Sequence, residues 1–425
     1  MRIFIGTCEI ASHYGLIAKE LRRRGHVVSV FGPLLYERDR QNLNSLIFPL
    51  IIERLALKSR VNLPKGLRFV ASKILLALLL FWICLRVDCV LLYGGSSFVS
   101  LPFDLFLLRL FKIKIIFNCA HGSESRPPYI NSKYNNDSRK SYSLTKSIYV
   151  RVKAMERHSH SIIGLPVLSQ FFVKKLVHRD LIGKPVDLAY EIGHRTPVSD
   201  CTGRKRAIRI CHIPSDPLSK GTDDIRRIVA DLGRFGISPE DYCYEEYRGL
   251  KRNEVVEVLR NSDLVITQLF SDIATPTTAL EATAVGCLAI VCGNAAELGK
   301  VSKGGAVSLY ILPDRLPMVL ARLVGNHNLI ARLAGKYTKQ YMLEYSVARC
   351  AAKYERLFVG EVPDEWFFDP IEYSYCWGDG ISKEEVRRRI NKYVGRYGFG
   401  ALYVAHNTKL EAMFKAMQGS DCSGG

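Results

Sequence analysis

The chain has 425 residues and a formal net charge of +19, and 48% of its residues are hydrophobic and 24% charged. This length exceeds a single ordinary domain core, and the apolar content excludes a chain that is disordered throughout. The charge favours an anionic partner, but the lysines and arginines are spread over LRRRG, VKK, RKR and VRRR, which argues against nucleic acid and leaves a membrane surface or an acidic substrate.

The amino-terminal segment MRIFIGTCEIASHYGLIAKELRRRGHVVSVFG predicts a buried strand, a helix entered through Gly15, and a second strand at 26–31. Because MRIFIG already reads as a strand, we expect no signal peptide and a cytoplasmic protein, peripheral at the inner membrane face. Residues 48–70 mix apolar with basic side chains. They predict either a helix lying among anionic lipid headgroups or an ordinary amphipathic helix packed on the sheet.

The apolar run at 74–85 is too short to cross a bilayer, which needs about 20 residues. We therefore expect a buried helix there, followed by a strand at 88–93. The chain then alternates loop, helix and strand up to HGSESRPP, and His121 comes directly after an apolar strand. A histidine at this place either contacts a ligand at the carboxyl end of a parallel strand or simply satisfies a backbone carbonyl.

No pattern in the sequence indicates a metal site or a disulfide framework. His158 and His160 lack a third ligand nearby, and the twelve cysteines include no CxxC pair. The cysteines lie mostly in apolar strands and helices, so we expect reduced thiols in the protein core.

The second half opens with another strand, loop and helix. Residues 207–213, AIRICHI, predict a buried strand, and the turn-rich loop PSDPLSKGT follows, before a helix that begins with two acids. Lys220 stands beside Gly221 at the helix entrance, where a flexible point charge suits a phosphate, and Ser215 in the same loop is a further candidate contact. A lone lysine here would equally be an ordinary surface residue.

A second helix start follows the apolar strand in DLVITQLF. In TPTTALEATAVG we expect Thr275 as N-cap and Pro276 at the first helical position. Thr277, Thr278 and Glu281 then share one face, with backbone N–H groups for a diphosphate and a carboxylate for the two ribose hydroxyls. Glu281 taken alone would be a solvated helix residue. Two phosphate-competent helix starts in one α/β domain favour a nucleotide site.

In this order and spacing, HIPSDPLSKGTDDI, SDLVITQLF and PTTALEATAVGCLAIV resemble the carboxy-terminal domain of retaining glycosyltransferases of family 4. The resemblance implies the GT-B fold, in which two Rossmann-like, doubly wound α/β domains face a cleft. It implies that Lys220 and Gly221 hold the donor pyrophosphate and that Glu281 holds the ribose. The substrates would be a UDP- or GDP-linked sugar and a glycan or lipid-linked acceptor, as in envelope polysaccharide synthesis, without a cofactor or a required metal.

The amino-terminal half resembles the acceptor domain of the same family. Gly15 lies in its opening β-α-β unit and joins the donor-binding candidates, and HGSESR is similar to a stretch in which the histidine lies against the donor sugar. The resemblance gives His121 that role and places Arg126 at the matching arginine, with Glu124 in place of the usual aspartate.

Two positions depart from the family pattern. The first family glutamate would be residue 273, which is Ile273, so that either Asp272 replaces it or backbone groups alone contact the sugar. The loop before Lys220 also lacks the usual arginine, which leaves Arg126 or Arg248 as the further phosphate or acceptor contact. The departures keep open a catalytically inactive scaffold, and a UDP-sugar 2-epimerase of the same fold is a further alternative. A nucleic-acid-binding protein is favoured by charge alone.

We expect an acceptor domain at 1–197, a nucleotide-sugar domain at 205–345, and a closing helix with an extension at 346–425. Residues after 359 lie outside the resemblance. They include an aromatic stretch and a short amphipathic helix in SKEEVRRRINKYVGRYG, to which no function is assigned, and the last residues are predicted to be disordered.

Overall fold

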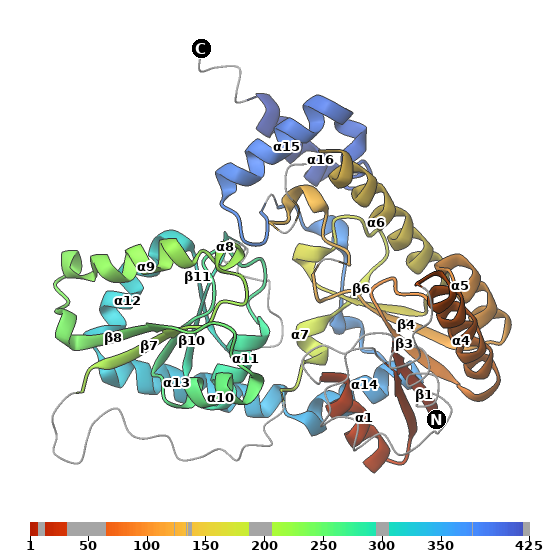
Figure 1. Cartoon of the computed structure of the whole chain (residues 1–425), viewed down its shortest axis with the longest axis horizontal. Helices are drawn as coiled ribbons and strands as arrows, with labels where there is room; N and C mark the ends of the chain where they lie inside the picture. The colour runs from red at the N-terminus through yellow and green to blue at the C-terminus, as the bar shows by residue number, and fades with distance from the viewer. Residues whose placement is uncertain are drawn as a thin grey trace. The chain divides into compact units, whose positions relative to one another are not determined.

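The computed structural model describes residues 1–6, 13–31, 65–122, 124–132, 134, 138–186, 206–294, 306–375 and 377–419 (Figure 1). The chain divides into two compact units, each assembled from three segments. The first unit comprises Met1–Arg126, Thr145–Asp187 and Val347–Glu372, and the second comprises Pro127–Leu144, Leu188–Ser346 and Tyr373–Gly425. No helix within the described ranges is long and apolar enough to cross a membrane.

The first unit is built on a sheet with the strand order β12-β6-β5-β4-β3-β1-β2 among the described residues. All neighbours pair in parallel except β12 with β6, and Phe4 of β1 lies opposite Ser29 and Val90 of its two neighbours. The strands are β1 (Arg2–Gly6), β2 (Val27–Phe31), β3 (Cys89–Tyr93), β4 (Lys114–Asn118), β5 (Ser161–Gly164), β6 (Leu176–His178) and β12 (Phe367–Phe368).

The helices of this unit follow from right-handed crossovers between parallel strands. The chain runs from β1 to β2 in one direction and from β2 back across β1 to β3 in the other, so the connecting helices lie on opposite faces. Accordingly α1 packs with α14, and α4 lies beside α5 (Figure 1). The helices are α1 (His13–Arg23), α4 (Lys65–Arg86), α5 (Leu101–Leu110), α7 (Arg179–Ile182) and α14 (Val347–Val359), while α6 (Ser138–His158) spans the boundary of the two units.

The second unit has a wholly parallel sheet with the order β11-β10-β9-β7-β8 in the part of the chain that is described. Its strands are β7 (Ile208–His212), β8 (Tyr242–Glu246), β9 (Leu264–Ile266), β10 (Leu288–Cys292) and β11 (Leu309–Ile311). Its helices are α8 (Pro217–Lys220), α9 (Thr222–Ala230), α10 (Arg252–Arg260), α11 (Thr277–Ala284), α12 (Leu316–Val324) and α13 (His327–Glu344).

Both faces of this second sheet are buried. Ile210 and Ile290 join the apolar cluster that includes residues of α9 and α12. Their neighbours Cys211, Ala289 and Val291 face the other way, into a cluster with residues of α10 and α11. Side chains alternate across a strand, so a strand covered on both sides needs an almost continuous apolar sequence. This explains why AIRICHI could be recognised as a strand without any alternating pattern. The fold is therefore two doubly wound α/β units.

The carboxy-terminal extension adds two helices, α15 (Lys383–Tyr397) and α16 (Thr408–Gly419). The predicted amphipathic helix is confirmed as α15, whose first turn is capped by the Ser382 hydroxyl accepting from the Glu385 N–H at 3.3 Å. The Arg389 guanidinium donates to the carbonyls of Asn131 and Tyr134, so α15 is fastened to the segment at the start of the second unit.

One expectation about the apolar run at 74–85 is wrong. The run is helical, within α4, but it is not buried all round, because one stripe of large apolar side chains is about half exposed. Residues 48–64 of the predicted interfacial segment lie outside the described residues. The predicted strand before β4 is confirmed as β3. Of the described cysteines, Cys243 is exposed, and the others are buried free thiols.

Candidate functional site

The strand order of the second unit reverses at β7, because β8 lies on one side of β7 and β9 on the other. The loops that leave the carboxyl ends of β7 and β9 therefore run to opposite faces of the sheet. Ligands of such sheets bind at this switch point, which we call the crevice between β7 and β9. Lys220 comes from the loop after β7, and Gln268 from the segment after β9. The Lys220 ammonium donates to the Gln268 side-chain oxygen, so the two loops meet at this point.

The loop that carries Lys220 has a tightly defined backbone. Asp216 caps the short helix α8 by accepting from the Leu218 N–H at 3.2 Å, and Gly221 follows Lys220 in the left-handed conformation at φ 68°. A Cβ on Gly221 would lie 2.8 Å from the Leu269 Cβ, and the Leu269 N–H donates to the Lys220 carbonyl at 3.0 Å. Gly221 is thus required both for its φ and for space. Ser215 lies earlier in this loop and is exposed.

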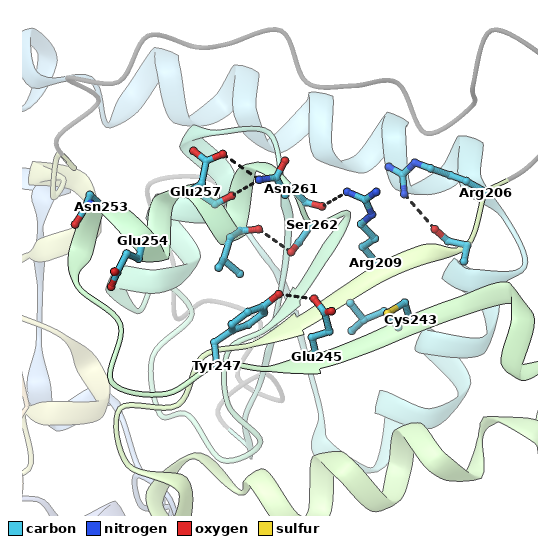
Figure 2. Close-up of a pocket in the computed structure, with 13 residues that line it drawn as sticks. Arg206, Arg209, Cys243, Glu245, Tyr247, Asn253, Glu254, Glu257, Asn261 and Ser262 are labelled. Carbon is cyan, nitrogen blue, oxygen red and sulfur yellow. Dashed lines mark hydrogen bonds between the residues drawn. The ribbon is translucent and has the colours of Figure 1, made fainter.

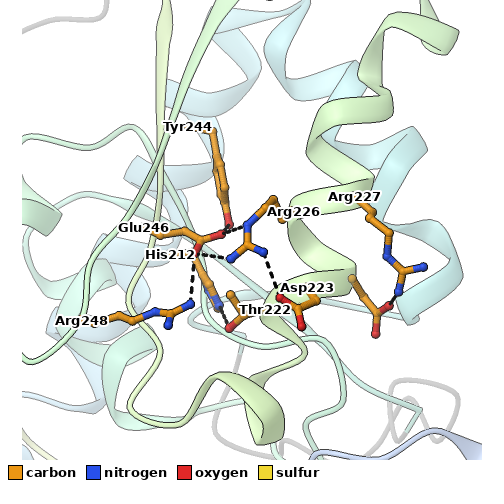
Figure 3. Close-up of polar contacts among 9 residues, drawn as sticks. His212, Thr222, Asp223, Arg226, Arg227, Tyr244, Glu246 and Arg248 are labelled. Atoms are coloured by element: carbon orange, nitrogen blue, oxygen red, sulfur yellow. Dashed lines mark hydrogen bonds and ion pairs between the residues drawn. The ribbon is translucent and has the colours of Figure 1, made fainter.

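His212, at the end of β7, has a structural role that the sequence did not reveal (Figure 3). Its Nδ1 lies 2.7 Å from the Ile266 carbonyl, which can only accept, so Nδ1 carries the proton. Its Nε2, 2.9 Å from the Thr222 hydroxyl, then accepts from that hydroxyl. Burial lowers the pKa of His212, in agreement with a neutral ring. The histidine ties β7, β9 and the start of α9 together.

Charges at the end of β8 are paired with each other. Glu246 receives two hydrogen bonds from Arg226 and one from the Tyr244 hydroxyl (Figure 3). The Arg226 hydrogen bond is the main cause of the lowered pKa of Glu246. Arg248, a predicted phosphate or acceptor contact, lies 3.6 Å from Glu246 and is 55% exposed. Arg248 therefore stands at the same edge of the sheet as His212, with its charge partly balanced by Glu246.

The helix start in TPTTALEATAVG differs by one residue from the expectation. The N-cap is Pro276 rather than Thr275, and α11 begins at Thr277. Proline cannot donate a hydrogen bond, and its fixed φ suits the entry to a helix as well as the first turn. The side chains of Thr277 and Thr278 are partly exposed at this start. Since the first N–H groups of a helix have no acceptor within it, they point towards whatever lies before the helix.

Glu281 lies one turn into α11 and is 8% exposed, so it is not the solvated residue of the simpler interpretation. Its carboxylate is 3.4 Å from the Nε of Arg252, the first residue of α10. A carboxylate offers about four lone-pair sites, so an ion pair at one oxygen is compatible with hydrogen bonds from hydroxyls to the same group.

The loop between β9 and α11 is held by side chains that contact its backbone. Ser271 bonds the Ile273 carbonyl at 2.7 Å, and the Tyr310 hydroxyl donates to the Ser271 carbonyl at 3.0 Å. A Cβ on Gly293 would lie 1.8 Å from that same carbonyl, so the loop packs directly on a glycine. Asp272 is 3% exposed, whereas Ile273 is partly exposed. Burial, followed by the charge of Asp272, raises the pKa of Tyr310.

The carboxy-terminal extension reaches this same region, which the sequence gave no reason to expect. The Gly380 N–H donates to the Phe270 carbonyl at 2.7 Å. Gly380 has a φ of 73°, and a Cβ there would lie 2.7 Å from the Ser219 carbonyl, beside Lys220. Asp379 is also among the charges that raise the pKa of Tyr310. The loop around Gly380 therefore packs on both segments that form the crevice between β7 and β9.

The first unit has its own cluster at the carboxyl ends of its strands. His13 begins α1, which follows β1, and Tyr93 ends β3, so the order reversal at β1 places them at the switch point of this sheet. His121 follows β4, and its ring lies 5.4 Å from Tyr93 and 6.2 Å from His13 between centroids. The Tyr14 hydroxyl is 3.3 Å from the His121 Nε2. Gly15, the third residue of α1, is partly buried beside this cluster.

Both histidines of this cluster are held neutral. Burial lowers the pKa of His13 and of His121 well below the usual range, and the cations Lys184 and Arg179 lower both further. Arg179 is itself buried and fastened to Asp180 by two hydrogen bonds. Neutral imidazoles beside fixed cations can exchange hydrogen bonds with sugar hydroxyls while the cations attract negative charge. His13, Arg179 and Lys184 were not predicted, and only the position of His13 after a strand and loop carried a signal.

In the loop after His121, the carboxylate of Glu124 accepts hydrogen bonds from the backbone of the same loop. Glu124 is buried and accepts from the N–H groups of His121 and Gly122 at 2.5 and 2.9 Å, and from the Tyr93 hydroxyl at 3.3 Å. Gly122 has a φ of 130°, and a Cβ there would lie 3.0 Å from a guanidinium nitrogen of Arg126. Arg126 is 4% exposed. Glu124 and Arg126 thus shape the loop that presents His121.

A cavity of about 920 Å³ lies elsewhere in the second unit, between β7, β8 and α10 (Figure 2). Its arginines are already engaged, since Arg206 pairs with Asp263 and Arg209 donates to the Asn261 carbonyl. Its lining also carries three glutamates, Glu245, Glu254 and Glu257, which disfavour a diphosphate. Neither Lys220 nor Gln268 lines this cavity, and its size alone does not make it the nucleotide site.

No protein-family model matches the chain, and no curated protein does. Among solved structures, it is similar to a sucrose-phosphate synthase of Thermosynechococcus elongatus, with 10% identity over 85% of this chain and 99% of that chain and a TM-score of 0.49. It is also similar to HepE of Anabaena in complex with UDP, with 13% identity over 84% of this chain and 99% of that one and a TM-score of 0.46. At such low identities and TM-scores, this likeness by itself assigns neither a family nor an activity.

Proposed function

We propose that the chain is a GT-B glycosyltransferase that moves a sugar from a nucleoside diphosphate to a glycan or lipid-linked acceptor, with retention at the anomeric carbon. The observation that carries the proposal is the meeting of Lys220 and Gln268 at the switch point of the second sheet. An anionic ligand is expected where a cation, a glycine turn and the carboxyl ends of parallel strands come together.

In the proposed site the donor diphosphate binds the Lys220 ammonium and the N–H groups at the start of α11, and Gly221 lets the backbone approach. Glu281 accepts the ribose hydroxyls, since it is buried on the helix that follows. Cleavage of the glycosidic bond leaves negative charge on the diphosphate. A lysine and a helix start that are already in place stabilise this charge without reorganisation, which is where such a site gains most of its rate.

In the first unit, we assign the neutral ring of His121 to the hydroxyls of the sugars, while His13, which is 0% exposed and lies 3.4 Å from the Tyr354 hydroxyl, supports it from behind. A ring with one protonated and one bare nitrogen can donate to one hydroxyl and accept from another. No metal or cofactor is needed for these steps, and the groups named here supply only binding and charge. Asp272 stays a candidate for the sugar contact that Ile273 lacks.

A direct test incubates the purified chain with UDP- and GDP-sugars and measures release of the free nucleotide, with and without added glycan acceptors. Release that Lys220→Met and Glu281→Ala both diminish supports the transferase. Interconversion of the sugar at C2 without release identifies an epimerase instead.

One observation favours a second candidate, a scaffold that binds the nucleotide sugar without turning it over. Ile273 occupies a partly exposed position in the loop before α11, where an acid would be able to contact the sugar. Nucleotide binding that depends on Glu281, with no turnover of any donor and acceptor tested, would identify this scaffold.

We also propose that the chain meets its acceptor at a membrane surface. A formal net charge of +19 favours a peripheral position on an anionic inner membrane face, where a lipid-linked acceptor would be reached.

A further inference from the structure

Helices α4 and α5 of the first unit lie side by side (Figure 1). Both expose an unusual number of large apolar side chains. On α4 the exposed large apolar side chains recur every three or four residues, which places them on one stripe of the helix. On α5 the same spacing recurs, and the stripe continues to the helix end. We call the exposed residues of these two stripes the apolar face; they are Val70, Ile74, Leu78, Phe81, Leu85, Phe103, Phe106, Leu110 and Phe111.

The apolar face is not an incompletely buried core. The opposite side of α4 is fully packed, with Leu79, Leu80 and Ile83 at 0–1% exposure, so the helix already has its place in the first unit. The outward side chains are large and well exposed, with Phe81 at 56% and Phe106 at 58%. Single exposed apolar residues are ordinary, but a contiguous group of this size marks a surface that another phase or molecule covers.

Among the described residues, the charged side chains that α4 and α5 expose are all positive. The sequence of α4 contains no acid, and α5 contains one, Asp104. That carboxylate is buried and accepts from the N–H groups of Phe98 and Val99. The basic residues Arg86, Arg109 and Lys112, in contrast, are exposed around the face. The surface therefore combines apolar bulk with positive charge and presents no exposed acid on either helix.

We propose that the apolar face inserts into the outer part of an anionic phospholipid monolayer, with the surrounding arginines and lysines on the lipid phosphates. Large apolar side chains rimmed by basic residues are what an interfacial helix needs, since acyl chains accept the former and anionic headgroups the latter. A second copy of this chain would bury the same apolar area, but it would bring the positive side chains of the two copies together. The helices lie along the surface and do not cross it.

This surface shares Val70 with the segment 48–70 that the sequence singled out, but its other residues lie outside that segment. It deepens the peripheral position in the proposed function. It does not depend on sugar transfer, because the test needs no donor or acceptor. The experiment measures co-sedimentation of the full chain with vesicles of phosphatidylcholine alone and with vesicles that also contain phosphatidylglycerol. We expect binding to the second kind, and a decrease as salt screens the charges.

The decisive variants are Phe81→Glu and Phe106→Glu, and the matched control is Phe235→Glu in the second unit. Phe235 is 48% exposed, so all three changes replace an exposed phenylalanine and cost little stability. We expect each of the two variants on the apolar face to bind at least tenfold more weakly, and the control to bind as the wild type does. Equal binding by all three, or no binding by the wild type, overturns the proposal.

Depth is measured separately with brominated lipids, which quench tryptophan fluorescence on contact. Trp82 lies on α4, whereas Trp366 lies near the end of the first unit's last segment. We expect quenching that Trp82→Phe removes and Trp366→Phe preserves; the reverse pattern contradicts insertion through α4. If light scattering shows a dimer that Phe81→Glu dissociates, and vesicles are not bound, the occupant is a second copy and the proposal fails.

Discussion

Replacement of Glu281 by alanine separates the two roles open to this carboxylate. If Glu281 holds the ribose, Glu281→Ala removes a charged acceptor from one or two hydroxyls. Each hydrogen bond to a charged group is worth about 1.5–3 kcal/mol, and about 1.4 kcal/mol corresponds to a tenfold change in Kd. Loss of a single such bond therefore weakens UDP or GDP about 10- to 150-fold. If Glu281 serves only its 3.4 Å contact with Arg252, nucleotide affinity stays unchanged.

The assay is isothermal titration of the full chain with the nucleoside diphosphate. The control is Arg252→Ala, which breaks the ion pair and keeps the carboxylate of Glu281. A 2′-deoxynucleotide, which lacks one of the two ribose hydroxyls, tests the same contact through a change in the ligand. We expect it to bind the wild type more weakly than the ribonucleotide and to bind Glu281→Ala equally well. Equal affinity of wild type and Glu281→Ala for the ribonucleotide, or equal losses in Glu281→Ala and Arg252→Ala, would refute the ribose assignment. Asp272→Ala should weaken the nucleotide far less than Glu281→Ala, because Asp272 is assigned to the sugar.

Three further outcomes are expected. Lys220→Met should raise the Kd for UDP at least tenfold and leave the Kd for uridine nearly unchanged in a parallel titration, since only the diphosphate meets the ammonium; equal losses for both contradict it. His13 and His121 have pKa values below the unfolded value of about 6.5, so in acid the folded state binds fewer protons than the unfolded state. As the pH is lowered from about 6.5, the free energy of unfolding should therefore decrease, by at most about 1.4 kcal/mol per pH unit for each histidine. Urea denaturation at a series of pH values measures this decrease. A His13→Asn variant should flatten this dependence, and an unchanged slope would disprove the cause. Gly293→Ala should lower the Tm strongly because its Cβ would meet a carbonyl at 1.8 Å, whereas Gly335→Ala, with nothing within 4 Å on an exposed helix turn, should match or exceed the wild type.

Elements with both faces covered were the most predictable part of this chain. The strands β3, β7 and β9 are short apolar runs, and each was recognised from its composition. Local turn chemistry likewise located the loop at Lys220. The start of α11 was displaced by one residue, because proline suits both the N-cap and the first helical position and only the backbone decides between them.

Burial by distant segments was not predictable. The run 74–85 is apolar on all sides, so its periodicity does not tell which side of α4 meets the sheet and which meets solvent. Gly380 carries no motif, and its contact with the loop of Lys220 depends on how the extension folds back on the second unit. Lys184 and Arg179 are similarly ordinary in sequence and become informative only where the fold places their charges beside His13 and His121.

The central claim is that the crevice between β7 and β9 binds a nucleoside diphosphate. A crystal structure of the chain soaked with UDP or GDP tests it most directly. The proposal predicts the diphosphate within hydrogen-bonding distance of the Lys220 ammonium and the first N–H groups of α11, with the ribose hydroxyls on Glu281. Nucleotide bound instead in the cavity between β8 and α10, or no bound nucleotide at millimolar concentration, would contradict it.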